Sequence, residues 1–373
     1  MIYFDNSATT YKKPLCVKLA TLAGLKVANP GRSGHRLSLM AGKKIFTTRL
    51  KLQTFFNVPR QEDVIFTQNC TEALNFAILG SSQKGHVVAS TFEHNSVLRP
   101  LKKLEKDGII TLTILTPTQN NIVTKEDVQM ALKDNTYLVC VSYINNTLGN
   151  KNEIYKIGKL CKERNIKFLC DCAQACGHID IDMQRDNISM LTFAGHKGFF
   201  APQSIGGLCL NDVCLKPIKY GGTGTNSDSL SMPEQTPESL ESGTLACPQI
   251  FGLSAGIDYV IKHFEQHAKK VSALTNYLIE KLSSIGANIY THKDSRYGVV
   301  LFNLKNFDSV ELSQILDEKY NIMVRGGLHC AGKAHKYLGT LSTGAVRVSV
   351  NHYNSKRQIN KFINALKDIQ NNY

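Results

Sequence analysis

The residues of this chain that could carry chemistry include a lysine in an apolar stretch. Residues 193–200 read FAGHKGFF, so Lys197 follows a histidine and lies between Gly195 and Gly198. Burial disfavours the charged ammonium of a lysine and lowers its pKa. Lys197 is therefore predicted to serve as a neutral amine nucleophile.

A second feature is the segment NCTEALN, which follows the apolar run DVIFTQ. Asn69 and Glu72 have the spacing of a capping box that opens a helix. The exposed amides of the first helical turn, together with the Thr71 hydroxyl, suit a phosphate group. A helix cap that binds nothing explains the same residues equally well.

The third feature is Asp171, which ends the apolar run IKFLCD and precedes Gln174. A carboxylate at a strand end can stabilise a proton on a heteroaromatic nitrogen, although it can also simply cap the next helix. An aldehyde cofactor with a ring nitrogen and a phosphate needs a lysine, an acid and an anion site. The three features together therefore indicate pyridoxal 5'-phosphate as the cofactor.

The elements that position these residues alternate along the first two thirds of the chain. Short apolar runs separated by helical patterns predict a mainly parallel sheet covered on both faces, and such sheets bind ligands at the carboxyl ends of their strands. The runs are DVIFTQ, TEALNFAIL, GHVVAS, GIITLTIL, KEDVQMALK, YLVCVSYI, EIYKIGKLCKERN, IKFLCD, ISMLTFAG and SIGGLCL.

The pattern changes near residue 248 to a long helical segment, followed by short strands and helices. We predict a large α/β domain over residues 15–248. A smaller α+β domain is expected to combine residues 1–14 and 249–373. The glycine- and serine-rich segment 220–244 is too long for an ordinary connector, which favours a functional role.

Composition places the chain among globular proteins of the cytoplasm. Its 373 residues are 42% hydrophobic, and MIYFDNSATT lacks the order of a signal peptide. No apolar run approaches the ~20 residues that span a bilayer. The eleven scattered cysteines favour reduced thiols. Cys170, Cys172, Cys176 and His178 resemble a metal cluster, but FLCDC reads as a buried strand and no metal is expected.

The net charge of +14 raises the question of nucleic-acid binding. The basic residues occur as dispersed pairs without a long run or a nucleic-acid motif, which favours solvated lysine-rich surfaces. Nucleic acid is therefore not the expected partner. An acidic protein partner or a transient tRNA contact stays open.

The whole chain resembles the class V aminotransferase-like pyridoxal phosphate enzymes, which have the type I transferase fold. Within them it is similar to cysteine desulfurases with a short cysteine loop. The resemblance is specific because many separated motifs recur in order. They are YFDNSATT, NPGRSGHRLS, NCTEALN, FEHNSV, SYINNTLG, DCAQACGHIDI, FAGHKG, YGGTGTNS, LESGTLACP, VRGGLHCA and VRVSVNHYNS.

The resemblance implies a role for each matching residue around the cofactor ring. Lys197 becomes the Schiff-base lysine and Asp171 the partner of the pyridinium nitrogen. His94 is expected to stack on the ring as part of the catalytic set. Gln174 would bond the phenolic oxygen, and Asn146 would lie close by.

The resemblance also implies how the phosphate is held. Cys70 and Thr71 at the helix start, His196, and Thr244 of the partner subunit are expected to bind it. A residue contributed by a second copy of the chain implies a homodimer with shared sites.

Substrate binding and sulfur transfer are assigned in the same way. Arg347 matches the arginine that clamps the substrate carboxylate, a group suited to a planar bidentate donor, and Arg325 is expected to assist. Cys330 in its glycine-rich loop is the expected nucleophile, favoured by positive charge from Arg325 or a protonated His329. His329 could equally be an ordinary loop residue without a chemical role. The loop is expected to be mobile.

These roles imply conversion of L-cysteine to L-alanine, with a persulfide on Cys330 passed to an acceptor protein. Iron-sulfur cluster assembly, tRNA thiolation and selenium metabolism are open as the pathway. A selenocysteine lyase, a cysteine C-S lyase or an aminotransferase on the same scaffold is the alternative.

Two positions depart from the family pattern. Ala194 stands where relatives have Ser or Thr, so one phosphate hydroxyl is missing and cofactor affinity is expected to be lower. Gly332 stands where relatives often have proline, which predicts a looser cysteine loop.

Overall fold

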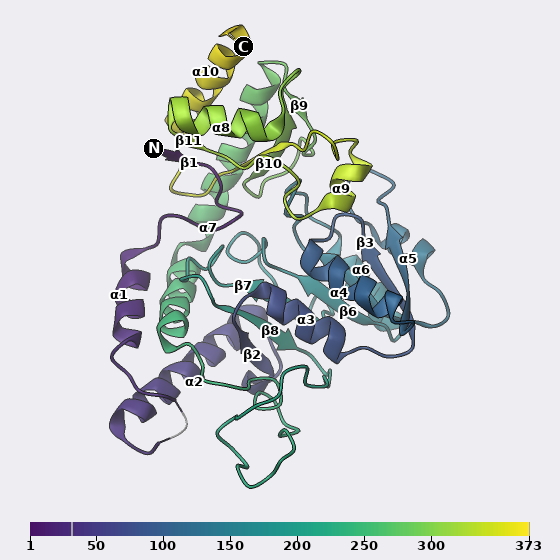
Figure 1. Cartoon of the computed structure of the whole chain (residues 1–373), viewed down its shortest axis with the longest axis vertical. Helices are drawn as coiled ribbons and strands as arrows, with labels where there is room; N and C mark the ends of the chain where they lie inside the picture. The colour runs from purple at the N-terminus through teal and green to yellow at the C-terminus, as the bar shows by residue number, and fades with distance from the viewer. Residues whose placement is uncertain (31–32, 373) are drawn as a thin grey trace.

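The computed structural model describes residues 1–30 and 33–372. Its main element is a seven-stranded sheet in the order β2-β8-β7-β6-β5-β3-β4, in which only β8 runs antiparallel to its neighbours. Helices lie along this sheet (Figure 1), which confirms the predicted α/β fold. The strands are β2 (Val64–Thr67), β3 (Gly85–Ser90), β4 (Ile110–Leu115), β5 (Thr136–Ser142), β6 (Lys167–Asp171), β7 (Met190–Ala194) and β8 (Gly206–Leu210).

Alternation along the strands gives each face of the sheet its own core. Cys170 of β6 and Leu191 of β7 belong to one cluster, with residues of α2, α5, α6 and the start of α7. Leu169 and Met190 belong to the other, with α3 and α4. Both faces are therefore covered, as predicted. The helices are α2 (Arg36–Phe56), α3 (Cys70–Gly80), α4 (Asn95–Lys106), α5 (Lys125–Ala131), α6 (Ile154–Glu163) and α7 (Cys247–Ser283).

Two small sheets, β12-β10-β9 and β1-β11, form a second layer with its own core beside α8, α10 and the end of α7. Helix α7 begins against the large sheet, where α1 packs on it, and runs into this layer (Figure 1). The predicted domain division stays a prediction. The elements are β1 (Ile2–Tyr3), β9 (Asn288–Ile289), β10 (Val299–Asn303), β11 (Ile322–Met323), β12 (Val346–Ser349), α1 (Leu15–Gly24), α8 (Ser309–Tyr320), α9 (Gly332–Tyr337), α10 (Lys356–Asn372) and the short 3₁₀ helix η1 (Gln61–Asp63).

The connection between β8 and α7 is a long loop over residues 211–246, drawn at the bottom of Figure 1. It contains the segment 220–244 that the sequence marks as functional, and most of that segment is exposed. Over the described ranges, no helix is both long and apolar enough to cross a membrane. All eleven cysteines are free thiols.

A histidine cluster joins the second layer to the large sheet. The rings of His267 on α7 and His352 after β12 stack at 3.5 Å with an 8° angle between their planes. Burial lowers the pKa of His178 and of His267 to about 4, and that of His352 to about 3, with the neighbouring histidines adding to each effect. The cluster is therefore neutral in the folded protein at neutral pH.

We predict that this cluster makes the fold sensitive to acid. A histidine in the unfolded chain binds a proton below pH ~6.5, whereas these residues resist protonation in the fold, so stability is full above pH ~6.5 and falls as the pH drops toward 4. Denaturant unfolding at pH 7.5, 6.5, 5.5 and 4.5 should show this loss. The His267→Asn variant should show a shallower pH dependence. Equal slopes for the two proteins would contradict the prediction.

Candidate active site

The predicted site residues gather in one pocket at the carboxyl ends of β5, β6 and β7, next to the start of α3. Its volume is about 240 Å³, far above the ~10–15 Å³ that one water molecule needs. The lining confirms that strand ends and a helix start meet here. It includes Cys70, Thr71, His94, Asn146, Asp171, Gln174, His196, Lys197, Arg325 and Arg347.

Lys197 reaches the pocket from the turn after β7. Burial lowers the pKa of its amine, and the nearby carboxylate of Asp171 only partly opposes this effect. The amine nitrogen has no hydrogen-bond partner among the residues that the structure describes. A buried amine of lowered pKa suits a nucleophile, and the catalytic role of Lys197 stays a prediction.

Asp171 stands at the end of β6 with its carboxylate at the pocket. One oxygen, Oδ1, accepts a hydrogen bond from the Ala173 N–H at 2.9 Å and from the Cys70 thiol at 3.6 Å. Burial raises the pKa of Cys70 well above its usual value, so this thiol keeps its proton and donates it. In the structure Cys70 therefore contacts the acid, while its expected role toward a phosphate stays a prediction.

A chain of hydrogen bonds connects the start of α3 with the start of α4. The Thr71 hydroxyl lies 2.8 Å from the Ser96 hydroxyl, which lies 2.9 Å from Nδ1 of His94. The Ser96 N–H also donates to Nδ1, so the proton of the neutral ring sits on Nε2. Burial lowers the pKa of His94 to about 4, which keeps the ring neutral. Ser96 lies in the motif FEHNSV, but the sequence alone does not identify it as a site residue.

Arg347 of β12 is buried, with only 1% of its surface exposed. Its guanidinium donates to the Asp5 carboxylate at 2.9 Å and to the Asn146 carbonyl at 3.0 Å. The Nε–H of the same group has no partner among the residues described. Asp5 is a site residue that sequence reasoning missed, although it lies in the motif YFDNSATT.

Cys330 is exposed at the edge of the pocket. Its sulfur lies 3.8 Å from the guanidinium of Arg325, whose backbone pairs with that of Arg347. The Asn95 N–H donates to the Cys330 carbonyl at 2.8 Å, and the Asn146 side chain donates to the His329 carbonyl at 2.9 Å. Two hydrogen bonds, from the start of α4 and from Asn146 after β5, thus hold the backbone of residues 329 and 330.

The cysteine loop continues into a helix, and the looseness expected from the missing proline stays a prediction. Helix α9 begins at Gly332, two residues after Cys330. Position 332 is the first helical position, where a proline is well tolerated. Burial lowers the pKa of His329 well below its usual value, and its Nδ1 lies 3.1 Å from Nε2 of His335. His329 is therefore neutral and supports the loop, and the positive charge near the sulfur comes from Arg325 at 3.8 Å, with Arg347 also interacting electrostatically with Cys330.

Thr244 does not lie with the other predicted residues. It is exposed in the long loop and lines a separate pocket with Lys219 and Glu241. The prediction that it completes the site of a partner subunit is not tested by a single chain.

Unpaired polar groups show that the pocket suits an anionic ring compound. Nδ1 of His196 and Nε of Arg347 are buried without a partner within the described ranges. Buried polar groups are normally paired, so unpaired ones around a cavity indicate a ligand that completes them. An acid, an amine and a helix start around one cavity fit pyridoxal phosphate.

Comparison with known proteins agrees with this chemistry. The family model for class V aminotransferases matches residues 2–362. The chain belongs to the class V aminotransferase family. It is 33% identical to a probable cysteine desulfurase of Methanothermobacter thermautotrophicus, over 99% of this chain and 94% of the relative. It is 32% identical to a probable cysteine desulfurase of Pyrococcus abyssi, with the same coverage.

Among solved structures, this class V aminotransferase chain is similar to the apo cysteine desulfurase of Thermococcus onnurineus NA1. The TM-score is 0.91 at 30% identity, covering 99% of this chain and 94% of that one. The predicted resemblance to cysteine desulfurases within the class V aminotransferases is confirmed.

The glycine after the lysine is predicted to be essential for this turn of the class V aminotransferase fold. A Cβ on Gly198 would lie 1.7 Å from the Cys176 carbonyl oxygen, which is backbone and cannot move freely. We expect Gly198→Ala to lower the free energy of unfolding by about 1–3 kcal/mol and to displace Lys197. Gly42→Ala is the control, because a Cβ there meets nothing within 4 Å in a helix. Similar denaturation midpoints for the two variants would contradict the prediction.

Proposed function

We propose that the protein is a pyridoxal phosphate-dependent cysteine desulfurase, which converts L-cysteine to L-alanine and transfers the sulfur through Cys330. The observation that carries this proposal is the position of Cys330. Its exposed sulfur lies beside the Arg325 guanidinium at the edge of a pocket that holds the buried amine of Lys197. The relatives named cysteine desulfurases support the same conclusion.

The residues that would hold the cofactor come from three elements of the large sheet. Lys197 would bond its aldehyde carbon, and Asp171 would hold the proton of its ring nitrogen. The start of α3 with Thr71, together with His196, would bind its phosphate. When bound, the cofactor supplies an electron-withdrawing ring that acidifies the α-carbon of an amino acid. Ala194 lines the phosphate side without a hydroxyl, so lower cofactor affinity stays a prediction.

The buried amine of Lys197 is suited to taking the α-proton of the substrate. Burial lowers its pKa and so favours the neutral amine, which has the lone pair that accepts a proton. His94 contributes a neutral ring to the lining of the pocket, because its pKa is low and its Nδ1 accepts a hydrogen bond from the Ser96 N–H. Proton transfer thus depends on Lys197, while His94 limits the space in which a planar ring can lie.

Arg347 is suited to binding the substrate carboxylate. Asp5 and the Asn146 carbonyl fix its two terminal nitrogens, which leaves the Nε–H without a partner in the described structure. Burial of the guanidinium strengthens its attraction for an anion. We infer that the carboxylate orients cysteine with its side chain toward Cys330.

Sulfur transfer follows from the position of Cys330. Its sulfur, as a thiolate beside Arg325, would form a bond to the sulfur of the substrate. The substrate's bond between carbon and sulfur breaks, a persulfide stays on Cys330, and the former β-carbon gains a proton to give alanine. Arg325 offsets the negative charge on the attacking sulfur.

The decisive test of this function is the Cys330→Ala variant. We expect alanine release from cysteine to fall at least about 100-fold and the protein-bound persulfide to disappear, because the nucleophile is lost. Mass spectrometry of the intact protein and an alanine assay measure both. Cys214→Ala is the matched control, since Cys214 is also exposed but lies in the long loop after β8, away from the pocket-lining Arg325 that contacts Cys330.

The same variant separates the alternative functions. A cysteine C-S lyase, a selenocysteine lyase or an aminotransferase leaves its sulfur, selenium or nitrogen on small molecules. Such an enzyme would keep most of its turnover after Cys330→Ala. Full turnover by the variant would therefore contradict the desulfurase proposal.

We also propose a homodimer. Four leucines on one side of α1 are exposed, with exposed fractions of 57–69%, and further apolar side chains of α2 are exposed as well. Contiguous exposed apolar surface marks a protein interface. Burying this face against a second copy would also allow Thr244 of the partner subunit to reach the phosphate. The leucines are Leu15, Leu19, Leu22 and Leu25.

The persulfide acceptor is proposed to be an acidic protein. Residues 319–367 contain no Asp or Glu, and this stretch includes the whole cysteine loop. Lys333 and Lys336 of α9 are exposed next to Cys330, and Leu328 and Tyr337 add exposed apolar surface. Charge complementarity of this kind speeds association with an acidic partner. The free thiols favour a cytoplasmic location, which stays a prediction.

This surface predicts a charge-dependent transfer step. The double variant Lys333→Glu, Lys336→Glu should slow persulfide transfer to a peptide with one cysteine among aspartates by about tenfold or more. Transfer to dithiothreitol should not change. A Lys361→Glu, Lys367→Glu variant on α10 carries the same charge change as a control. Equal slowing by both variants would show that net charge, and not this surface, matters.

A further inference from the structure

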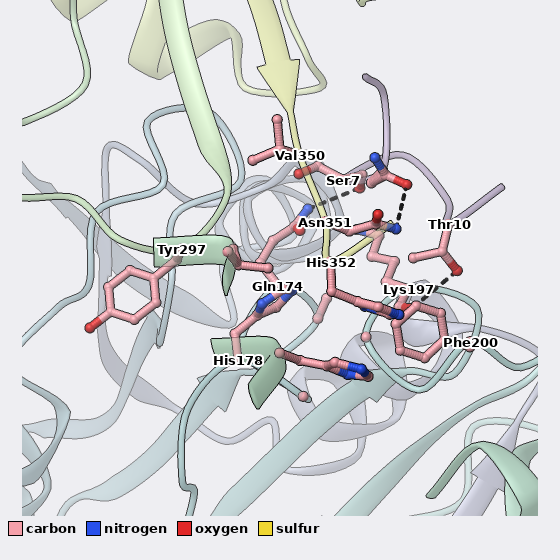
Figure 2. Close-up of a pocket in the computed structure, with 16 residues that line it drawn as sticks. Ser7, Thr10, Gln174, His178, Lys197, Phe200, Tyr297, Val350, Asn351 and His352 are labelled. Atoms are coloured by element: carbon pink, nitrogen blue, oxygen red, sulfur yellow. Dashed lines mark hydrogen bonds between the residues drawn. The ribbon is translucent and has the colours of Figure 1, made fainter. Parts of the chain in front are cut away.

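The N-terminal residues 5–13 touch three site residues that lie on different elements. The segment follows β1 and runs across the pocket before α1 begins. Figure 2 shows hydrogen bonds from it to the side chain of Gln174 and to the backbone of Lys197. We propose that this segment, the N-terminal strap, is a positioning element whose Asp5, Thr10 and Lys13 fix the substrate clamp and the catalytic amine. The proposal rests on the proposed function of the site.

The first contact of the strap is the ion pair between Asp5 and Arg347. The carboxylate lies 2.9 Å from the guanidinium, and the arginine side chain is only 2% exposed. The Tyr3 hydroxyl donates to the backbone carbonyls of Asp5 and Thr9, each at 3.0 Å, which fixes the strap around this carboxylate. A buried arginine needs a partner to hold its charge and its direction. Asp5 is the carboxylate that orients Arg347.

The second contact sets the direction of the Gln174 amide. Its Nε2 donates to the Ser7 carbonyl at 3.1 Å, as Figure 2 shows. The Ser7 N–H in turn donates to the hydroxyl of Ser349 in β12 at 2.9 Å. The strap therefore connects the residue after β6 with the strand that carries Arg347.

The third contact holds the backbone on both sides of Lys197. The His196 carbonyl accepts from the Thr10 hydroxyl at 3.0 Å and from the Lys13 amine at 2.9 Å. The Thr10 hydroxyl also lies 3.3 Å from the Lys197 carbonyl, and Lys13 donates to this hydroxyl at 2.9 Å. Thr10 and Lys13 thus bind the peptide groups on either side of Lys197. These bonds fix the position of the Lys197 Cα, from which the side chain extends.

Lys13 gives this contact its own dependence on pH. Burial lowers the pKa of Lys13 to about 8, so its ammonium loses its proton in mild alkali. The titratable groups beside it are His196, whose pKa is lowered to about 4, and Lys197, whose pKa is lowered chiefly by burial. The charge-assisted bond to the His196 carbonyl therefore weakens above pH ~8.

A test on the protein without cofactor separates this proposal from the proposed function. The reactivity of Lys197 toward acetic anhydride, followed by peptide mass spectrometry from pH 6 to 10, reports the position and protonation of its amine directly. Thr10→Val and Lys13→Met should change the labelling rate of Lys197 about threefold or more. Lys13→Arg should restore it and remove the inflection near pH 8, because arginine stays charged.

The control for a loss of stability alone is Thr124→Ala. It removes the capping box of α5, away from the pocket, at a cost of about 1 kcal/mol. Its Lys197 labelling should match the original protein. If the strap variants and this control label alike, the strap serves folding only and the proposal is wrong.

Kinetics of the cofactor-loaded enzyme test the contact at Asp5. Asp5→Asn should raise KM for cysteine about tenfold or more with kcat changed less, because the clamp loses its direction. Thr10→Val and Lys13→Met should lower kcat with little effect on KM. An equal effect of all three variants on both constants would overturn the proposal. If the protein lacked desulfurase activity but the labelling changes were still observed, the proposed function would be wrong. The proposal about the N-terminal strap would then still stand.

Discussion

Desolvation of positive charge is the constraint on which this site depends. Lys197 and Arg347 both point into one pocket, and burial lowers the pKa of each. The two cations differ in their hydrogen-bond partners. Arg347 pairs with Asp5, whereas no hydrogen bond or ion pair reaches the Lys197 amine within the described residues, and burial lowers the pKa of that amine and so favours its neutral form. One pocket thereby offers an anion clamp and a base.

The same constraint explains why the site needs contacts between distant parts of the chain. Asp171 and Lys197 come from adjacent strands of the large sheet, and their positions follow from its register, in which Asp171 pairs with Thr192. Arg347 comes from a different sheet, which has no backbone bond to the large one through its strands. Besides helix α7, loops that meet over the pocket help to fix its distance from Lys197. The N-terminal strap and the bond from Asn146 to the His329 carbonyl are such connections.

The sequence predicts the part of this arrangement that depends on local rules. Asp171 and Lys197 are visible because each ends an apolar strand, and Asn69 because its side chain caps α3 by accepting from the Glu72 N–H at 2.9 Å. Asp5 and Ser96 were missed because their importance comes from partners far away in the chain or across the pocket. The hydrogen bonds from Asn95 and Asn146 to the backbone carbonyls of Cys330 and His329 are likewise not predictable from the sequence. Tertiary contacts of this kind leave no spacing pattern.

The choice of one thiol among eleven follows from the same physics of burial. Burial raises the pKa of Cys140, Cys161, Cys170, Cys172, Cys176 and Cys209, so these thiols keep their protons and serve as small apolar side chains in the core. Three cysteines are exposed, and of these only Cys330 has a guanidinium within 3.8 Å of its sulfur. Exposure lets a large acceptor reach the sulfur, and the arginine favours its charged form. The proposed sulfur carrier, Cys330, is therefore both exposed and next to a guanidinium. The other cysteines are buried or partly buried, or are exposed without such a contact in the described structure.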